Sequence, residues 1–265
     1  MWKNLSSPWR DSKFLALQRL IQHRLHLVEC ITHEKPYMVS NICLKFNQLA
    51  VLDKEDKPFS DKYGATSAAV LTEFLSLDDI TYFSIEYLIA FVKEKGKNQI
   101  SNSLGTANLL QKAARDSYRL DKVLYKPLNV SITFSFNLIK AFESEVKTID
   151  KAIEKNIKGI NTTEYQFPKS IPGIGPVPAS GILAKIGFIS VFKSHNALAK
   201  YAGLTWRVNQ SGNSTSDDTN VSKTSNKYLR YHLIEAANSV KNNSPEYREY
   251  YNKKFGEVTT HQHKR

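Results

Sequence analysis

The sequence predicts a mainly α-helical protein: a long helical hairpin or coiled-coil linker with a helical insertion, followed by a compact helical domain. Three observations support this fold class. Apolar residues recur at steps of three and four in two long stretches. The region between those stretches shows no strand-like alternation. Six of the 11 glycines lie between residues 173 and 212, which is typical of short helices joined by tight turns. We therefore expect two regions, residues 1–167 and 168–265.

The first helix is predicted over residues 12–35. Its apolar stripe consists of Leu17, Leu20, Leu27 and Ile31. Arg24 occupies the position where the stripe lacks an apolar residue. Pro36 is expected to end the helix, because proline has no backbone N–H and its ring clashes with the preceding turn.

The second long helix carries a cleaner heptad pattern. The apolar positions are Ile139, Phe142, Val146, Ile149, Ile153 and Ile160. Asn156 is the one polar residue in this seam, a feature that often sets the register of paired helices. Two interpretations remain open: the two stripes face each other within one chain, or they join copies of the chain into a homo-oligomer through a coiled coil.

The middle zone, residues 51–130, is expected to form a small all-helical insertion. The run from Ser76 to Asp79 resembles a helix start with an acidic first turn. We find no arrangement of residues in this zone that indicates chemistry.

The charge balance favours a polyanionic partner. The chain has 37 Lys and Arg against 25 Asp and Glu, a net charge of +12. Residues 169–265 hold 14 basic and six acidic residues, a net of +8, so we expect this region to contact nucleic acid.

Metal, membrane and secretory classes find no support in the sequence. Cys30 and Cys43 have no metal-ligand spacing and are typical of thiols in a reducing cytosol. No apolar run approaches the roughly 18 residues of a membrane span. The expectation is a cytoplasmic protein with no metal site of its own.

A Pro-Gly-Ile-Gly turn opens the compact domain, followed by an apolar helix. Gly173 and Gly175 permit backbone conformations closed to other residues and a close approach of a ligand. A helix starting at Pro178 and ending at Gly187 would direct free N–H groups outward, a site for one phosphate. This pattern is typical of a helix-hairpin-helix element that contacts the DNA backbone. The alternative is a purely structural turn.

A polar loop follows. Ser194 is expected to cap a helix that ends at Gly203, and a basic helix is expected over residues 226–241. Between them lies a loop with the step Ser211-Gly212. Ser, Thr and Asn are common in any loop, so composition alone names no nucleophile.

Four motifs in this order resemble the C-terminal domain of one family of insertion-sequence transposases, numbered one-hundred-and-ten, one-hundred-and-sixteen and eleven-eleven. They are Ile171-Pro-Gly-Ile-Gly-Pro176, Tyr201-Ala-Gly-Leu204, Asn209-Gln-Ser-Gly212 and Ser222-Lys-Thr-Ser-Asn-Lys-Tyr-Leu-Arg230. The preceding helices resemble the coiled-coil linker of the same family.

The resemblance implies a transposase, which cleaves and joins DNA strands in transposition and recombination. Ser211 would attack a DNA phosphodiester and form a transient phosphoserine bond. The cations that would hold phosphate oxygens are Arg207, Lys223, Lys227 and Arg230. In this family an N-terminal ribonuclease-H-like domain with acidic metal ligands acts together with a guide RNA.

No such acidic domain is recognisable in this sequence. We therefore expect a truncated transposase that binds DNA, uses Mg²⁺ only together with the acidic domain, and is inactive by itself. Two other readings stay open: a non-catalytic helix-hairpin-helix protein that binds DNA or RNA, and a helical interaction protein with an incidental basic surface.

Overall fold

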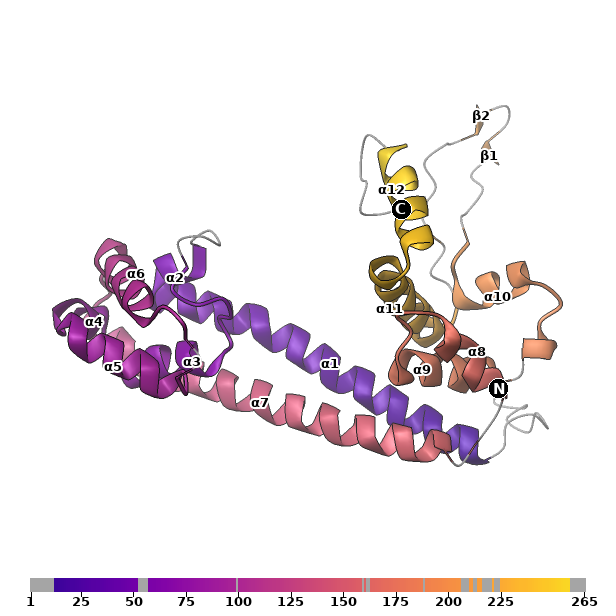
Figure 1. Ribbon diagram of the computed structural model, residues 1–265, viewed down its shortest axis with the longest axis horizontal. Helices are drawn as coiled ribbons and strands as arrows, with labels where there is room; N and C mark the ends of the chain where they lie inside the picture. The colour runs from indigo at the N-terminus through magenta and orange to yellow at the C-terminus, as the bar shows by residue number, and fades with distance from the viewer. Residues whose placement is uncertain are drawn as a thin grey trace. The chain divides into compact units, whose positions relative to one another are not determined.

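The computed structural model describes residues 12–51, 57–98, 100–158, 160, 163–187, 189–205, 210–211, 214–215, 221 and 225–257. Within these residues the protein is mainly α-helical, as predicted (Figure 1). The chain divides into two compact units. Unit 1 comprises Met1–His26 and Lys147–Arg265, and unit 2 comprises Leu27–Val146. The domain boundary expected between residues 167 and 168 remains a prediction.

Two long helices contribute to both units: α1 (Ser12–Lys45) and α7 (Lys122–Lys158). The prediction that Pro36 ends the first helix was wrong, because α1 continues through it to Lys45. An interior proline costs about 3 kcal/mol. The residues beyond it include Met38 and Ile42, both fully buried. Burying two such side chains contributes roughly 3–6 kcal/mol, enough to offset the proline.

The apolar seam predicted on α7 faces the interior of the chain. Ile139, Ile149 and Ile153 are all buried. Within unit 1, the Arg24 guanidinium on α1 contacts the Asp150 carboxylate on α7, with Nε 2.5 Å from Oδ1. The position of Arg24 within the apolar stripe is explained by this ion pair with Asp150 of α7. The structure therefore shows the intrachain pairing of the two alternatives left open by the sequence.

Unit 2 contains the predicted helical insertion. Its helices are α2 (Asn47–Val51), α3 (Ala65–Glu73), α4 (Leu77–Tyr82), α5 (Ile85–Lys95) and α6 (Ser103–Asp116). The predicted helix start at Ser76 is confirmed, since the Asp79 carboxylate accepts a 2.8 Å hydrogen bond from the Ser76 backbone N–H. The core of the insertion packs on α1 and α7 through Met38, Leu71, Leu88, Leu110 and Ile132.

A buried lysine joins the insertion to the long helices. Lys45, the last residue of α1, donates hydrogen bonds to the carbonyl oxygens of Leu71 (2.7 Å) and Phe74 (2.6 Å). It also contacts the side-chain oxygen of Asn129 on α7. Burial lowers the pKa of Lys45 to about 8, and the charge of Asp79 partly counteracts this shift. The ammonium is held because it satisfies carbonyls at the end of α3.

Unit 1 contains the compact C-terminal helices. They are α8 (Thr163–Ser170), α9 (Pro176–Ile186), the 3₁₀ turn η1 (Ile189–Val191), α10 (His195–Ala202), α11 (Lys227–Asn243) and α12 (Pro245–Gly256). Two two-residue strands, β1 (Gln210–Ser211) and β2 (Ser214–Thr215), pair antiparallel. The core lies between α9 and α11, where Ile182, Ile186, Leu229 and Ala236 are buried. Gln18 on α1 donates a 2.6 Å hydrogen bond to the Ala184 carbonyl, which ties α9 to the long helix.

The helix ends in unit 1 largely follow the predicted capping residues. Gly187 and Gly203 end α9 and α10 with positive φ angles of 67° and 68°. The side chains of Ser194 and Asn226 accept hydrogen bonds from backbone N–H groups in the first turns of α10 and α11. α9 begins at Pro176, two residues earlier than expected. In the described part of the chain, no helix is both long and apolar enough to cross a membrane.

Candidate nucleic-acid interface and serine loop

The turn between α8 and α9 contains the two predicted glycines, which have different surroundings. Gly173 has a φ of +97°, and a Cβ atom there would lie 2.8 Å from the Ser239 carbonyl oxygen on α11. A Cβ atom at Gly175 would meet nothing within 4 Å. Packing against α11 therefore explains Gly173 by itself. Gly175 is the glycine that faces open space, where a ligand has room to approach.

The first turn of α9 offers fewer hydrogen-bond donors than the sequence analysis supposed. A helix start normally leaves four backbone N–H groups without helical partners. Here Pro176 and Pro178 have none to offer. Gly175 and Val177 supply the remaining N–H groups. Two donors and the positive end of the helix dipole suit one phosphate oxygen or a pair of them.

Replacing the two glycines by alanine is expected to separate folding from binding. Gly173→Ala should lower the free energy of unfolding by about 2–4 kcal/mol. The alanine would have to adopt a positive φ, and its Cβ atom would clash with the Ser239 carbonyl oxygen. Gly175→Ala should leave that free energy within about 0.5–1 kcal/mol and weaken DNA binding instead. Urea unfolding followed by circular dichroism, with DNA titrations on the same proteins, measures both. A strongly destabilised Gly175→Ala protein would contradict this assignment.

The loop that contains Ser211 begins after α10 and ends before α11, and these two helix ends are hydrogen-bonded to each other. Asn226, at the start of α11, donates from its backbone N–H to the Tyr201 carbonyl (3.0 Å) and from its side chain to the Tyr201 hydroxyl (3.1 Å). Arg230 donates to the Ala202 carbonyl at 3.2 Å. The end of α10 is thus joined to the start of α11, and residues 204–225 form the loop between them.

Ser211 lies in β1, directly opposite Ser214 of β2. Only the backbone of this hairpin is described. Arg207 and Lys223, two of the predicted phosphate ligands, lie outside the described residues. Their roles, like that of Ser211, remain predictions.

Two other predicted cations lie in the first turn of α11, where the loop returns. Lys227 is exposed, and its ammonium is 5.1 Å from the centre of the Tyr228 ring. Arg230 is half-buried, and one of its N–H groups donates a hydrogen bond to the Ala202 carbonyl. Lys185 of α9 lies over the same Tyr228 ring at 4.7 Å. Lys185 could not be predicted from the sequence, because only the packing of α9 on α11 brings it to this ring.

A buried histidine lies between α9 and α11. His232 of α11 is 2% exposed, and its Nε2 has no hydrogen-bond partner among the described atoms. Its ring packs on α9 so closely that a Cβ atom at Gly181 would lie 2.3 Å away. Burial, together with the positive charges of Arg24 and Lys185, lowers the pKa of His232 to about 4. The imidazole is therefore neutral at pH 7 and acts as a packing group.

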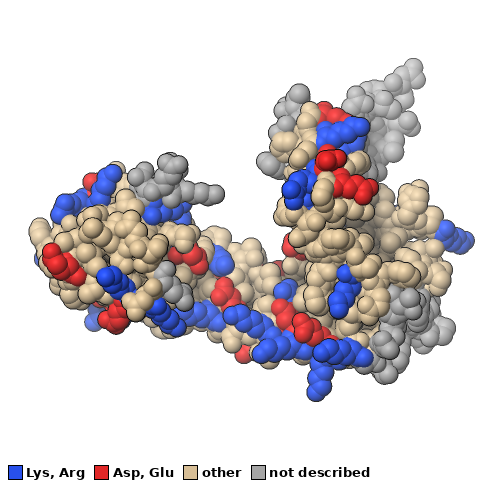
Figure 2. Space-filling view, in the orientation of Figure 1, with Lys and Arg blue, Asp and Glu red and all other residues tan. Residues whose placement is uncertain are grey.

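The net charge is confined to unit 1. Its residues include 23 Lys and Arg against 10 Asp and Glu, a net of +13, whereas unit 2 has 14 against 15, a net of −1. Figure 2 shows Lys and Arg side chains along the exposed side of α7, with Asp and Glu side chains among them. The ends of α1 and α7 within unit 1 therefore add to the basic character predicted for residues 169–265. No group of three His, Cys, Asp or Glu side chains that could hold a metal ion occurs among the described residues.

Comparison with known proteins identifies the segment that contains these features. The model of the transposase IS116/IS110/IS902 family matches residues 166–252, from α8 into α12. A "Probable family 20 transposase" of Pseudomonas aeruginosa is 28% identical over 102 residues, which are 38% of this chain and 29% of that protein. The chain thus covers less than a third of this relative. No solved structure is a significant match. The features described above therefore lie in a segment that is similar to the transposase domain of the IS116/IS110/IS902 family.

Proposed function

We propose that the chain acts in DNA transposition with Ser211 as the nucleophile. The family match supports transposition in general. The observation that supports Ser211 is its place in a loop whose two ends meet at the first turn of α11, beside Lys227 and Arg230. The test is capture of a covalent protein–DNA species that depends on this serine.

The proposed step is a phosphoryl transfer. The Ser211 oxygen forms a bond to phosphorus, the bond from phosphorus to one sugar oxygen breaks, and that oxygen leaves as a hydroxyl carrying the serine proton. The phosphoserine ester keeps the energy of the broken bond, so a second sugar hydroxyl can reverse the step and join a new strand. Arg207, Lys223, Lys227 and Arg230 would hold the phosphate oxygens as charge develops on them.

The reaction also needs activation of the serine hydroxyl, which is a weak nucleophile near neutral pH. The family resemblance assigns this to Mg²⁺ on an acidic domain, acting with a guide RNA. The described residues of this chain do not fit a Mg²⁺ site. We therefore propose that the carboxylates come from an acidic domain and that strand cleavage depends on that domain. If no activating domain exists, the chain would instead serve as a non-catalytic DNA- or RNA-binding protein.

We also propose that the chain forms a homo-oligomer through the outer face of its long helices in unit 2. On α1, Tyr37 and Leu44 are exposed by 59% and 56% and lie seven residues apart, and Val51 at the end of α2 is exposed by 63%. On α7, Val130 and Phe134 are likewise exposed, by 47% and 63%. Heptad spacing is the pattern of a helix that packs against another helix. A second copy fits this face because unit 2 is nearly neutral, whereas unit 1 would repel its own copy.

Leu44→Glu combined with Phe134→Glu is expected to convert the oligomer to a monomer, because both changes place charge in an apolar contact. Sedimentation equilibrium measures the mass of the full chain. The matched control is Tyr82→Glu on α4, another exposed residue of unit 2, which should leave the mass unchanged. A wild-type chain that is monomeric at tens of micromolar would exclude the proposal.

A further inference from the structure

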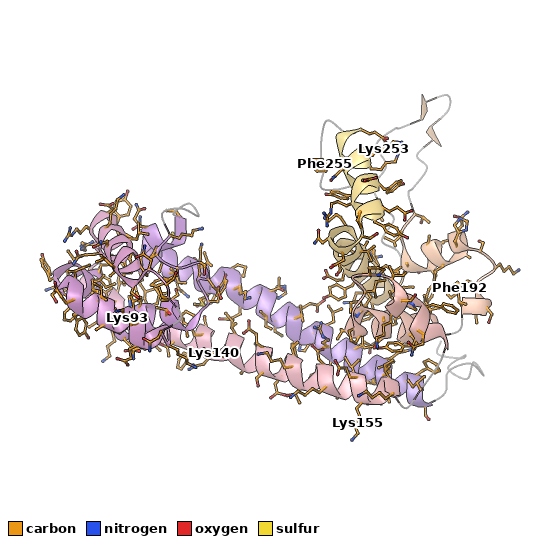
Figure 3. The ribbon with its side chains drawn as sticks, in the orientation of Figure 1. Lys93, Lys140, Lys155, Phe192, Lys253 and Phe255 are labelled. Atoms are coloured by element: carbon orange, nitrogen blue, oxygen red, sulfur yellow. The ribbon has the colours of Figure 1, made fainter. Side chains whose placement is uncertain are left out.

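The last turns of α7 carry a row of lysines. It consists of Lys147, Lys151, Lys155 and Lys158, referred to below as the α7 lysine row. All four are exposed. Steps of four, four and three place them on one face of the helix, over about 16 Å of its length. In Figure 3 the labelled Lys155 side chain projects away from the helix pair.

Helix stability does not account for this row. Like charges four residues apart destabilise a helix by a few tenths of a kcal/mol per pair. The helix dipole favours cations in the last turn, where Lys155 and Lys158 lie, but its effect does not reach Lys147 and Lys151. None of the four takes part in an ion pair recorded for the described residues. The row therefore repels itself in the free protein, and a polyanion would relieve that repulsion.

A groove continues the row toward the turn between α8 and α9. It has a volume of about 480 Å³ and is lined by Glu154, Ile157, Lys158, Tyr165, Gln166, Lys169 and Pro176. Lys169 is one of these lining residues, and its ammonium is 5.8 Å from the centre of the Tyr165 ring. Pro176 directly follows Gly175. Lys158 therefore links the α7 lysine row to the place proposed above for a backbone phosphate.

We propose that the α7 lysine row and Lys169 bind the phosphate backbone of duplex DNA, which continues from there onto the Gly175 turn. This inference rests on the proposed DNA function and extends its interface. The row lies before residue 166, outside the matched transposase domain. Lysine ammonium groups on one helix face neutralise phosphates without reading bases, so the contact positions DNA and does not select its sequence.

One acidic residue opposes this use of the groove. Glu154 is exposed and lies among the groove residues with Lys158 and Lys169. The pKa of the Tyr165 hydroxyl is raised by burial first and by the charge of Glu154 second, so the carboxylate acts within the groove. Replacing Glu154 by glutamine removes a negative charge from the path of the phosphates. Glu154→Gln should therefore bind duplex DNA more tightly, in the direction opposite to loss of the lysines.

The test uses the full chain and a 30-base-pair duplex of arbitrary sequence, with affinity measured by fluorescence anisotropy at several salt concentrations. The row variant is Lys147→Gln, Lys151→Gln and Lys155→Gln together. Its slope of log affinity against log salt should be smaller than that of the wild type by about 3, one for each lost contact. At 0.1 M salt its affinity should be lower by about tenfold or more. The control makes the same charge change in unit 2: Lys93→Gln, Lys112→Gln and Lys126→Gln, all at exposed positions.

The outcomes separate this inference from the function on which it rests. A wild-type chain that does not retain duplex DNA removes the proposed DNA role and this inference together. A wild type that binds DNA, with a row variant equal to the unit 2 control, overturns this inference alone. A row variant that loses a folded RNA and keeps duplex DNA also overturns it. Glu154→Gln supplies a gain of binding, which misfolding cannot produce.

Discussion

Ser211→Ala is expected to abolish a covalent protein–DNA species while leaving DNA affinity nearly unchanged. The serine oxygen is the only atom of this side chain that could bond to phosphorus, and alanine lacks it. Affinity for DNA should persist because it depends on phosphate contacts with the cations of unit 1. An all-or-none loss of the adduct with unchanged affinity is characteristic of a nucleophile.

The measurement combines end-labelled DNA with denaturing gels, on which a protein–DNA adduct migrates as a retarded band. The chain alone should show no band. The band should appear when the acidic domain of a family member, Mg²⁺ and its guide RNA are supplied in trans, because the hydroxyl needs activation and the leaving oxygen needs positive charge.

Ser214→Ala is the matched control, since Ser214 pairs directly with Ser211 across the short hairpin. This variant should retain the adduct. A band that survives Ser211→Ala would remove Ser211 from its role. Robust cleavage by the chain alone would contradict the requirement for a separate acidic domain.

Lowering the pH from 7 to 4 is expected to reduce the free energy of unfolding through His232. Its pKa in the folded protein is about 4, below the ordinary value of 6.5 that applies when the chain is unfolded. Between pH 6.5 and pH 4 the His232 imidazole is protonated in the unfolded chain but stays neutral in the folded protein. The stabilisation is therefore complete above about pH 6.5 and is lost as the pH falls through 4. The total effect is roughly 3 kcal/mol, at about 1.4 kcal/mol for each pH unit.

Urea unfolding at a series of pH values measures this effect, and His232→Leu isolates it from the titration of other groups. Leucine fills the space between Gly181 and α11 without a titratable nitrogen. The variant should lose the decline between pH 6.5 and 4, whatever its stability at pH 7. Superimposable pH profiles for the two proteins would show that His232 does not titrate in this window.

Local features of the fold could be predicted from the sequence because their causes are local. Ser194, Gly203 and Asn226 terminate or start helices through hydrogen bonds and φ angles within a few residues of themselves. The apolar period of α7 identified its buried face in the same way. The family resemblance also followed from short motifs in a fixed order, and the family model matches the same region.

The candidate site was predicted less completely, since its residues come from different elements. The motif resemblance identified the serine loop and Lys227, but it did not indicate that Lys185 lies over the same Tyr228 ring as Lys227. Gly173 was assigned to DNA, although its close neighbour is the Ser239 carbonyl, more than sixty residues away in the sequence. Such distances between side chains depend on how helices pack, which no local pattern records.

By itself, the sequence determined the helical class, the helix caps of unit 1, the basic excess and the transposase resemblance. Only the tertiary structure decided that α1 passes through Pro36, because the buried side chains beyond the proline offset its cost. It also decided that the +13 charge gathers in unit 1, because the start of α1 and the end of α7 pack with the C-terminal helices. Propensity and charge are properties of single residues, whereas burial and the clustering of charge arise from contacts between distant segments.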